Sequence, residues 1–101
     1  MIRNAYLRKA QRRLLDLETQ MGSIEAGEED ASADPTGPLA RRVYVLRNRL
    51  TVAKERLRDV RNAENGKWGP LKKAADDALD EAERALEKAN RMQHGSKSSP
   101  P

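Results

Sequence analysis

Hydrophobic residues recur every three or four positions along three segments of this chain, and this spacing constrains the fold more than any other feature. In the first segment these residues are Leu7, Ala10, Leu14, Leu17, Met21 and Ile24. In the second they are Leu39, Val43, Leu46, Leu50, Ala53, Leu57 and Val60. In the third they are Trp68, Leu71, Ala75, Ala78, Ala82, Ala85, Ala89 and Met92, and Leu79 and Leu86 widen this stripe on one side. Alternating steps of three and four place each set on one stripe of a helix, as in coiled coils.

The composition agrees with long helices that bury narrow seams. Charged residues make up 36% of the 101 residues, aromatic residues make up 3%, and there is no Phe. Few large side chains are therefore available to fill a thick globular core. We predict a single all-α coiled-coil domain over residues 1–93, with helices at about 2–26, 38–64 and 70–93.

Two segments without seams are predicted to lie outside the helices. Residues 27–37 begin at Gly27, a plausible helix stop, and contain four acids, one proline and no large apolar residue. This segment is predicted to be an acidic loop. Residues 94–101 are mainly Ser, Pro and Gly, and they are predicted to form a disordered tail.

The junction between the second and third segments leaves two arrangements open. It contains Gly66, Gly69 and Pro70, and Pro70 would clash with the carbonyl of Gly66 in a straight helix. A sharp turn gives three helices of about 36–40 Å each, folded back as an antiparallel hairpin or a three-helix bundle. A kink gives one rod of roughly 80 Å with the first helix packed on its basic half. The break favours the turn.

Positive charge is concentrated on the second segment. Its bases, the candidate contacts for a polyanion, are Arg41, Arg42, Arg47, Arg49, Lys54, Arg56, Arg58 and Arg61. Only two acids accompany them between Leu39 and Arg61. Such an excess can attract phosphate by charge alone, although no nucleic-acid-binding motif is present. On the third segment, Asp80 with Arg84 and Glu87 with Arg91 are expected to pair one helical turn apart.

Residues that carry chemistry are scarce, and we predict no enzymatic activity, no cofactor and no metal site. The chain has no cysteine, and its single histidine, His94, has no acid at metal-motif spacing. The acidic residues between Asp76 and Glu87 are expected to form a solvated helix face. Trp68 is expected to close the end of a seam, with an exposed anchor for a partner or membrane as the alternative.

The order of segments resembles a known family. Leu46-Arg47, Leu50, Ala53 and Leu57 are followed by Trp68, Leu71-Lys72 and the run Ala85-Leu86-Glu87-Lys88-Ala89. This pattern is similar to that of the small bacterial coiled-coil stress-response proteins. Gly69-Pro70 departs from it, because helix formers are expected after the tryptophan. The resemblance implies a cytoplasmic helper in the stress response and no particular chemistry.

Three functions follow as hypotheses. The first is a coiled coil that contacts a protein partner or self-associates. The second is charge-driven binding of nucleic acid through the Arg-rich segment. The third is reversible adsorption to lipid or granule surfaces by opening of the Ala-rich helix. No apolar run approaches the ~20 residues of a membrane span, and the lack of cysteine fits a reducing cytoplasm.

Overall fold

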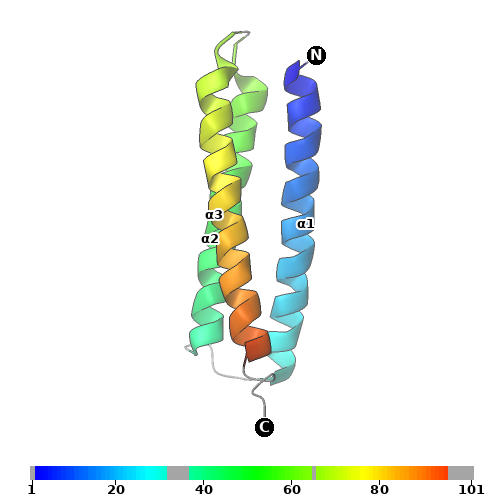
Figure 1. The fold of residues 1–101 in the computed structure, drawn as a ribbon, viewed down its shortest axis with the longest axis vertical. Helices are drawn as coiled ribbons and strands as arrows, with labels where there is room; N and C mark the ends of the chain where they lie inside the picture. Colours follow the sequence, from blue (N-terminus) through cyan, green and yellow to red (C-terminus); the bar gives the residue numbers. More distant parts are fainter. Residues whose placement is uncertain (1, 32–36, 65, 96–101) are drawn as a thin grey trace.

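Three helices packed side by side make up the protein. The computed structural model describes residues 2–31, 37–64 and 66–95. Helix α1 spans Ile2–Ala31, α2 spans Pro38–Asn62 and α3 spans Trp68–Gly95. Figure 1 shows α1 and α3 running in the same direction and α2 running opposite to both. The principal dimensions of 55 × 25 × 17 Å are those of a folded-back bundle, so the predicted all-α bundle is confirmed and the rod is excluded.

The first helix is longer than predicted. It was expected to end at about residue 26, yet α1 continues through Gly27 to Ala31. A glycine inside a helix costs only about 1 kcal/mol relative to alanine, and the neighbouring residues are Ala and Glu, which favour helix. The predicted loop 27–37 is therefore wrong over residues 27–31. Residues 32–36 of that loop lie outside the described residues.

A tight turn joins α2 and α3. Gly66 has a φ angle of 84°, a left-handed conformation that glycine adopts without steric cost. The N–H of Lys67 donates a hydrogen bond to the carbonyl of Glu64 at 3.0 Å. Helix α2 ends at Asn62, two residues before the predicted boundary, and the chain reverses within this turn.

The third helix was predicted to begin at Pro70, but this proline lies at the third position of α3. Helix α3 begins two residues earlier at Trp68. Proline is tolerated there because the first four N–H groups of a helix have no partner within it. At the other end, α3 continues to Gly95, so the predicted tail is wrong for residues 94 and 95. Residues 96–101 lie outside the described residues.

The core lies mainly between α2 and α3, the most closely packed pair. Helix α2 buries six residues, Val43, Leu46, Leu50, Ala53, Leu57 and Val60. Of the α3 side chains described, which end at residue 91, seven are buried: Ala75, Ala78, Leu79, Ala82, Ala85, Leu86 and Ala89. Leucines face a helix that is mostly alanine here, so the two backbones approach closely. Each fully buried leucine stabilises the fold by about 1.5–3 kcal/mol.

Helix α1 lies against this pair and buries less. Ala10, Leu17 and Ile24 are buried, one every seven residues. The other half of its heptad pattern, Leu7, Leu14 and Met21, is only partly buried against the core. Trp68 and Leu71 at the start of α3 are also partly buried against the core, so Trp68 packs as predicted rather than standing free.

Arg3 links the beginning of α1 to the end of α2. Its guanidinium donates hydrogen bonds to the carbonyl of Ala63 at 2.6 Å and to that of Val60 at 3.4 Å. The last carbonyls of a helix have no N–H partner within it. Arg3 therefore caps α2 from a neighbouring helix that is about 60 residues away in the sequence.

Candidate functional site

The eight bases of the second helix divide into two groups in the structure. Four of them, Arg47, Arg49, Lys54 and Arg56, form ion pairs. The other four, Arg41, Arg42, Arg58 and Arg61, are exposed and have no ion pair within the described part of the chain. The candidate polyanion contacts are thus not one uniform surface.

The paired bases mostly hold the helices together. Arg47 pairs with Glu25 and Lys54 pairs with Glu18 at 2.6 Å, both across to α1. Arg49 reaches Glu81 of α3 at 4.0 Å. These are exposed or half-exposed pairs, which typically contribute about 0–1 kcal/mol each. These ion pairs therefore help to determine which faces of the helices pack together, and they contribute little to the free energy of unfolding.

One arginine of α1 forms ion pairs with two carboxylates of α3. The Arg13 guanidinium lies 2.6 Å from Asp80 and 3.1 Å from Glu83. The hydrogen bond to Asp80 is the main reason that the pKa of Arg13 is raised. The expected pairing of Asp80 with Arg84 is therefore wrong, because Asp80 faces α1 instead. Glu87 does pair with Arg91, at 3.7 Å.

A second polar cluster closes the end of the bundle near the α2–α3 turn. The Tyr6 hydroxyl donates a hydrogen bond to Asp76 at 2.8 Å, and Lys72 binds the same carboxylate at 3.0 Å. The Tyr6 ring lies 6.0 Å from the Trp68 ring, centroid to centroid. Burial, followed by the hydrogen bond to Asp76, raises the pKa of Tyr6.

Asp76 itself experiences opposing effects. Burial, the largest of them, raises its pKa, but the hydrogen bonds from Lys72 and Tyr6 and the charges of Lys72 and Arg13 together outweigh burial. The net effect lowers the pKa of Asp76. This cluster holds Asp76 ionised and Tyr6 protonated, which suits a structural link between α1 and α3.

The acidic face of α3 is occupied by cations of the chain itself. All six of its acids form ion pairs within the protein: Asp76, Asp77, Asp80, Glu81, Glu83 and Glu87. Among the described residues, no group of three or more metal-ligating side chains comes together. The side chain of His94 lies outside the described residues.

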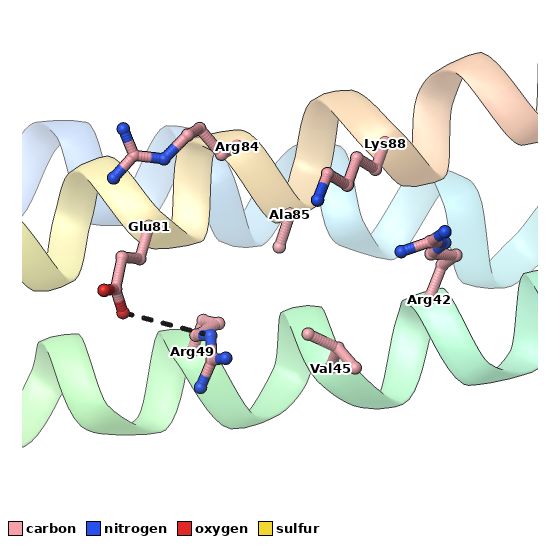
Figure 2. A pocket seen from close by; sticks show the side chains of 7 residues that line it. All are labelled: Arg42, Val45, Arg49, Glu81, Arg84, Ala85 and Lys88. Atoms are coloured by element: carbon pink, nitrogen blue, oxygen red, sulfur yellow. Dashed lines mark ion pairs between the residues drawn. The ribbon is translucent and has the colours of Figure 1, made fainter.

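A groove between α2 and α3 collects much of the remaining positive charge. This basic groove has a volume of about 270 Å³, and its residues are Arg42, Val45, Arg49, Glu81, Arg84, Ala85 and Lys88. In Figure 2, Val45 and Ala85 point toward one another across the groove. Arg49 and Glu81 lie to one side of them, and Arg42 and Lys88 to the other (Figure 2). Four cations and one carboxylate give the groove a net positive charge.

Two more shallow grooves flank α2. One, of about 250 Å³, lies against α1 and includes Leu14, Lys54, Arg58 and Arg61. The other, of about 200 Å³, includes Tyr44, Arg47, Asn48 and Thr51. All three grooves are open to solvent and lined mostly by charged or polar side chains. Their shape fits contact with another surface better than enclosure of a small substrate.

Only a few large apolar side chains are exposed in the described part of the chain. They are Ile2, Leu15, Tyr44 and Val45, and Tyr44 is 69% exposed. Tyr44 and Val45 are adjacent in the sequence of α2 but line different grooves, Val45 beside Arg42 in the basic groove and Tyr44 beside Arg47. The heptad residues with described side chains, by contrast, are buried or partly buried between the chain's own helices. The side chain of Met92 lies outside the described residues.

Sequence reasoning missed the α3 half of the basic groove. Arg84 was assigned to a pair with Asp80, and neither Lys88 nor Val45 was singled out. The available signal was the spacing of Arg84 and Lys88, one helical turn apart on either side of the seam residue Ala85. That signal could be used only with the knowledge that α2 lies beside this part of α3.

No protein-family model matches this chain, and comparison with curated proteins and with solved structures finds no significant similarity. Within the described residues, no helix has both the length and the apolar character that crossing a membrane requires.

Proposed function

We propose that this protein is a non-enzymatic interaction protein that binds a protein partner through the exposed side of α2. The observation that carries the proposal is the position of Tyr44 and Val45, which remain 69% and 38% exposed on a helix whose other large apolar residues are buried or partly buried. Tyrosine and arginine are enriched at protein interfaces, where they contribute much of the binding energy.

The buried seams support an outer surface as the contact site. The core residues of all three helices pack against one another within a single chain. A partner, or a second copy of the chain, would therefore meet the exposed residues of α2 and not the heptad stripes. Adsorption to lipid through the Ala-rich stripe would first have to separate α3 from α2.

The absence of catalysis is part of the proposal. The grooves beside α2 are lined mainly by arginine, lysine, aliphatic and amide side chains, together with Glu81, Tyr44 and Thr51, and these three grooves contain no histidine or cysteine. None of the described residues is a buried polar or charged side chain that could act in a water-excluded site. An interaction role needs neither feature.

Photo-crosslinking tests the interaction directly. A photoreactive benzophenone amino acid replaces Tyr44 in one variant and Lys73 in a control variant, since Lys73 is exposed on α3 away from this surface. We expect irradiation of cells to give a protein adduct of defined mass at position 44 only. Equal labelling at both positions, or no protein adduct at position 44, would contradict the proposal.

A second candidate function is charge-driven binding of nucleic acid. It is favoured by Arg41, Arg42, Arg58 and Arg61, which have no ion pair within the described residues. We expect a DNA duplex to be retarded by the protein at low salt and released steeply as salt rises, because each phosphate contact releases a counterion. Arg58→Gln/Arg61→Gln should reduce the slope of log affinity against log salt concentration by roughly the amount that two phosphate contacts contribute. No retardation at low salt excludes this function.

We further infer a cytoplasmic role in the stress response. The absence of cysteine and the resemblance to small bacterial coiled-coil stress-response proteins support it. Cell fractionation and protein abundance before and after stress measure the two parts separately.

A further inference from the structure

The basic groove carries charge that the fold itself does not use. Arg42, Arg84 and Lys88 are exposed and have no ion pair within the described residues. Only Arg49 has an acidic partner, Glu81 at 4.0 Å, and such an exposed pair is weak enough to exchange. Bringing these cations close together costs free energy unless something acidic lies between them.

The acids nearest in sequence are engaged elsewhere. Asp80 and Glu83, which lie one turn and one residue before Arg84, both bind Arg13 on α1. Glu87 binds Arg91 instead of its neighbour Lys88. Within the described residues, three of the four groove cations are thus left without an acidic partner, and a bound acidic ligand would neutralise them.

The centre of the groove is apolar. Val45 is 38% exposed and Ala85 is 9% exposed, and the two face one another between the cations (Figure 2). A phosphate backbone presents charge but no aliphatic side chain for this position. A ligand with both carboxylates and an aliphatic group satisfies the whole surface.

The spacing of the cations matches one face of an α-helix. Arg42 and Arg49 are seven residues apart on α2, about 10.5 Å along the helix axis. Arg84 and Lys88 are four residues apart on α3, about 6 Å. Acids at positions i, i+4 and i+7 of a helix from another protein would have matching spacings along its axis. The groove between the antiparallel helices α2 and α3 can accept such a helix by ordinary ridge-and-groove packing.

We propose that the basic groove between α2 and α3 binds an acidic amphipathic helix of the partner protein. This inference rests on the proposed function and adds the chemistry of the partner: carboxylates toward Arg42, Arg49, Arg84 and Lys88, and one aliphatic side chain over Val45 and Ala85.

A designed peptide tests this proposal with the full-length protein. The probe is a fluorescent helical peptide with glutamates at positions i, i+4 and i+7 around one leucine. A second peptide of identical composition has the same residues scrambled, so that its net charge is unchanged but its acidic face is lost. In fluorescence anisotropy, we expect the patterned peptide to bind at least tenfold more tightly than the scrambled one.

Matched variants locate the binding site. Arg84→Gln/Lys88→Gln removes two charges inside the groove, and Arg58→Gln/Arg61→Gln removes two charges beside the other groove, against α1. All four side chains are exposed, so circular dichroism and thermal unfolding should match the parent protein. The first variant should lose about tenfold or more in affinity for the patterned peptide, and the second less than about twofold.

Each other outcome is decisive. Equal affinity for both peptides, or equal loss in both variants, shows attraction by net charge and overturns the helix proposal. The proposal is also overturned, in favour of phosphate binding, if a DNA duplex displaces the peptide and its affinity falls in the groove variant by the same factor as that of the peptide. Absence of peptide binding, together with a protein adduct at position 44, overturns this inference alone and leaves the proposed function standing.

Discussion

Tyr6 shows how a single side chain can join two helices that are distant in the sequence. Its hydroxyl reaches Asp76 at 2.8 Å, its ring packs near Trp68, and the Lys72 ammonium lies 5.0 Å from the ring centroid. A hydrogen bond to a carboxylate is stronger than one between neutral groups. Tyr6 therefore contributes polar and apolar contacts from the same residue.

Tyr6→Phe is expected to lower stability and to change its dependence on pH. Near neutral pH the loss of the hydrogen bond to the ionised Asp76 should cost about 1.5–3 kcal/mol in the free energy of unfolding. The folded-state pKa of Tyr6 lies above its unfolded value, which is about 10. Its contribution is therefore complete below pH ~10 and is lost as the pH rises above that value. Chemical denaturation across this range should show a steeper decline for the parent protein than for the variant.

The control for this prediction is Tyr44→Phe, which removes the hydroxyl of an exposed tyrosine. It keeps the same number of lysines, whose titration at high pH affects all three proteins alike. A Tyr6→Phe protein with the parent's alkaline profile would show that the hydrogen bond to Asp76 does not stabilise the fold.

At the scale of the helix, the alanine stripe of α3 sets how closely α2 can pack. Ala75, Ala82 and Ala89 have no exposed surface, and Ala53 of α2 has none either. The distance between two helices depends on the size of the side chains at their contact. Leucines from α2 therefore fill space that larger α3 residues would occupy.

Ala82→Leu is expected to destabilise the bundle by about 1–3 kcal/mol, because a close-packed contact has no room for three further carbon atoms. Ala5→Leu is the matched control, since Ala5 is exposed on α1 and leucine is nearly as good a helix former as alanine. Urea denaturation of both variants provides the measurement. If the Ala82 variant were as stable as the parent, close packing of this stripe would be refuted.

At the scale of the whole molecule, the bundle is an α2–α3 pair with α1 added to it. Among the side chains that the structure describes, α1 contributes three buried residues, compared with six from α2 and seven from α3. Hydrogen bonds from Arg3 and Tyr6 also hold it near its beginning. Along the rest of the helix its polar links are half-exposed ion pairs from Glu18, Glu25 and Arg13, which are individually weak. Helix α1 is therefore held less strongly than the other two.

Native-state hydrogen exchange should reveal this difference. We expect the amides around Leu17 to open at least about tenfold more often than those around Leu50 and Ala82, a difference of about 1.4 kcal/mol. All three positions are buried and lie near the middle of their helices, so end fraying does not affect the comparison. Equal protection of the three helices would show that the bundle opens as one unit.

Local patterns in the sequence determined the helices and their buried stripes. The heptad residues of α2 and α3 whose side chains the structure describes lie in the core or against it, as predicted. Their spacing of three and four is a property of one helix and needs no partner to be recognised. The same local reasoning placed the end of α1 too early at Gly27, because one glycine costs only about 1 kcal/mol in a helix and its Ala and Glu neighbours favour helix.

Tertiary structure alone decided how the helices meet, and with that the candidate site. The chain reverses at Gly66, so α2 lies beside α3 and Arg42 and Arg49 come to the same groove as Arg84 and Lys88. Asp80 forms its ion pair with Arg13 of α1 and not with Arg84, the partner that the sequence spacing predicted. Ion pairs and grooves depend on distances between residues that are far apart in the chain, and hydrophobic periodicity holds no information about those distances.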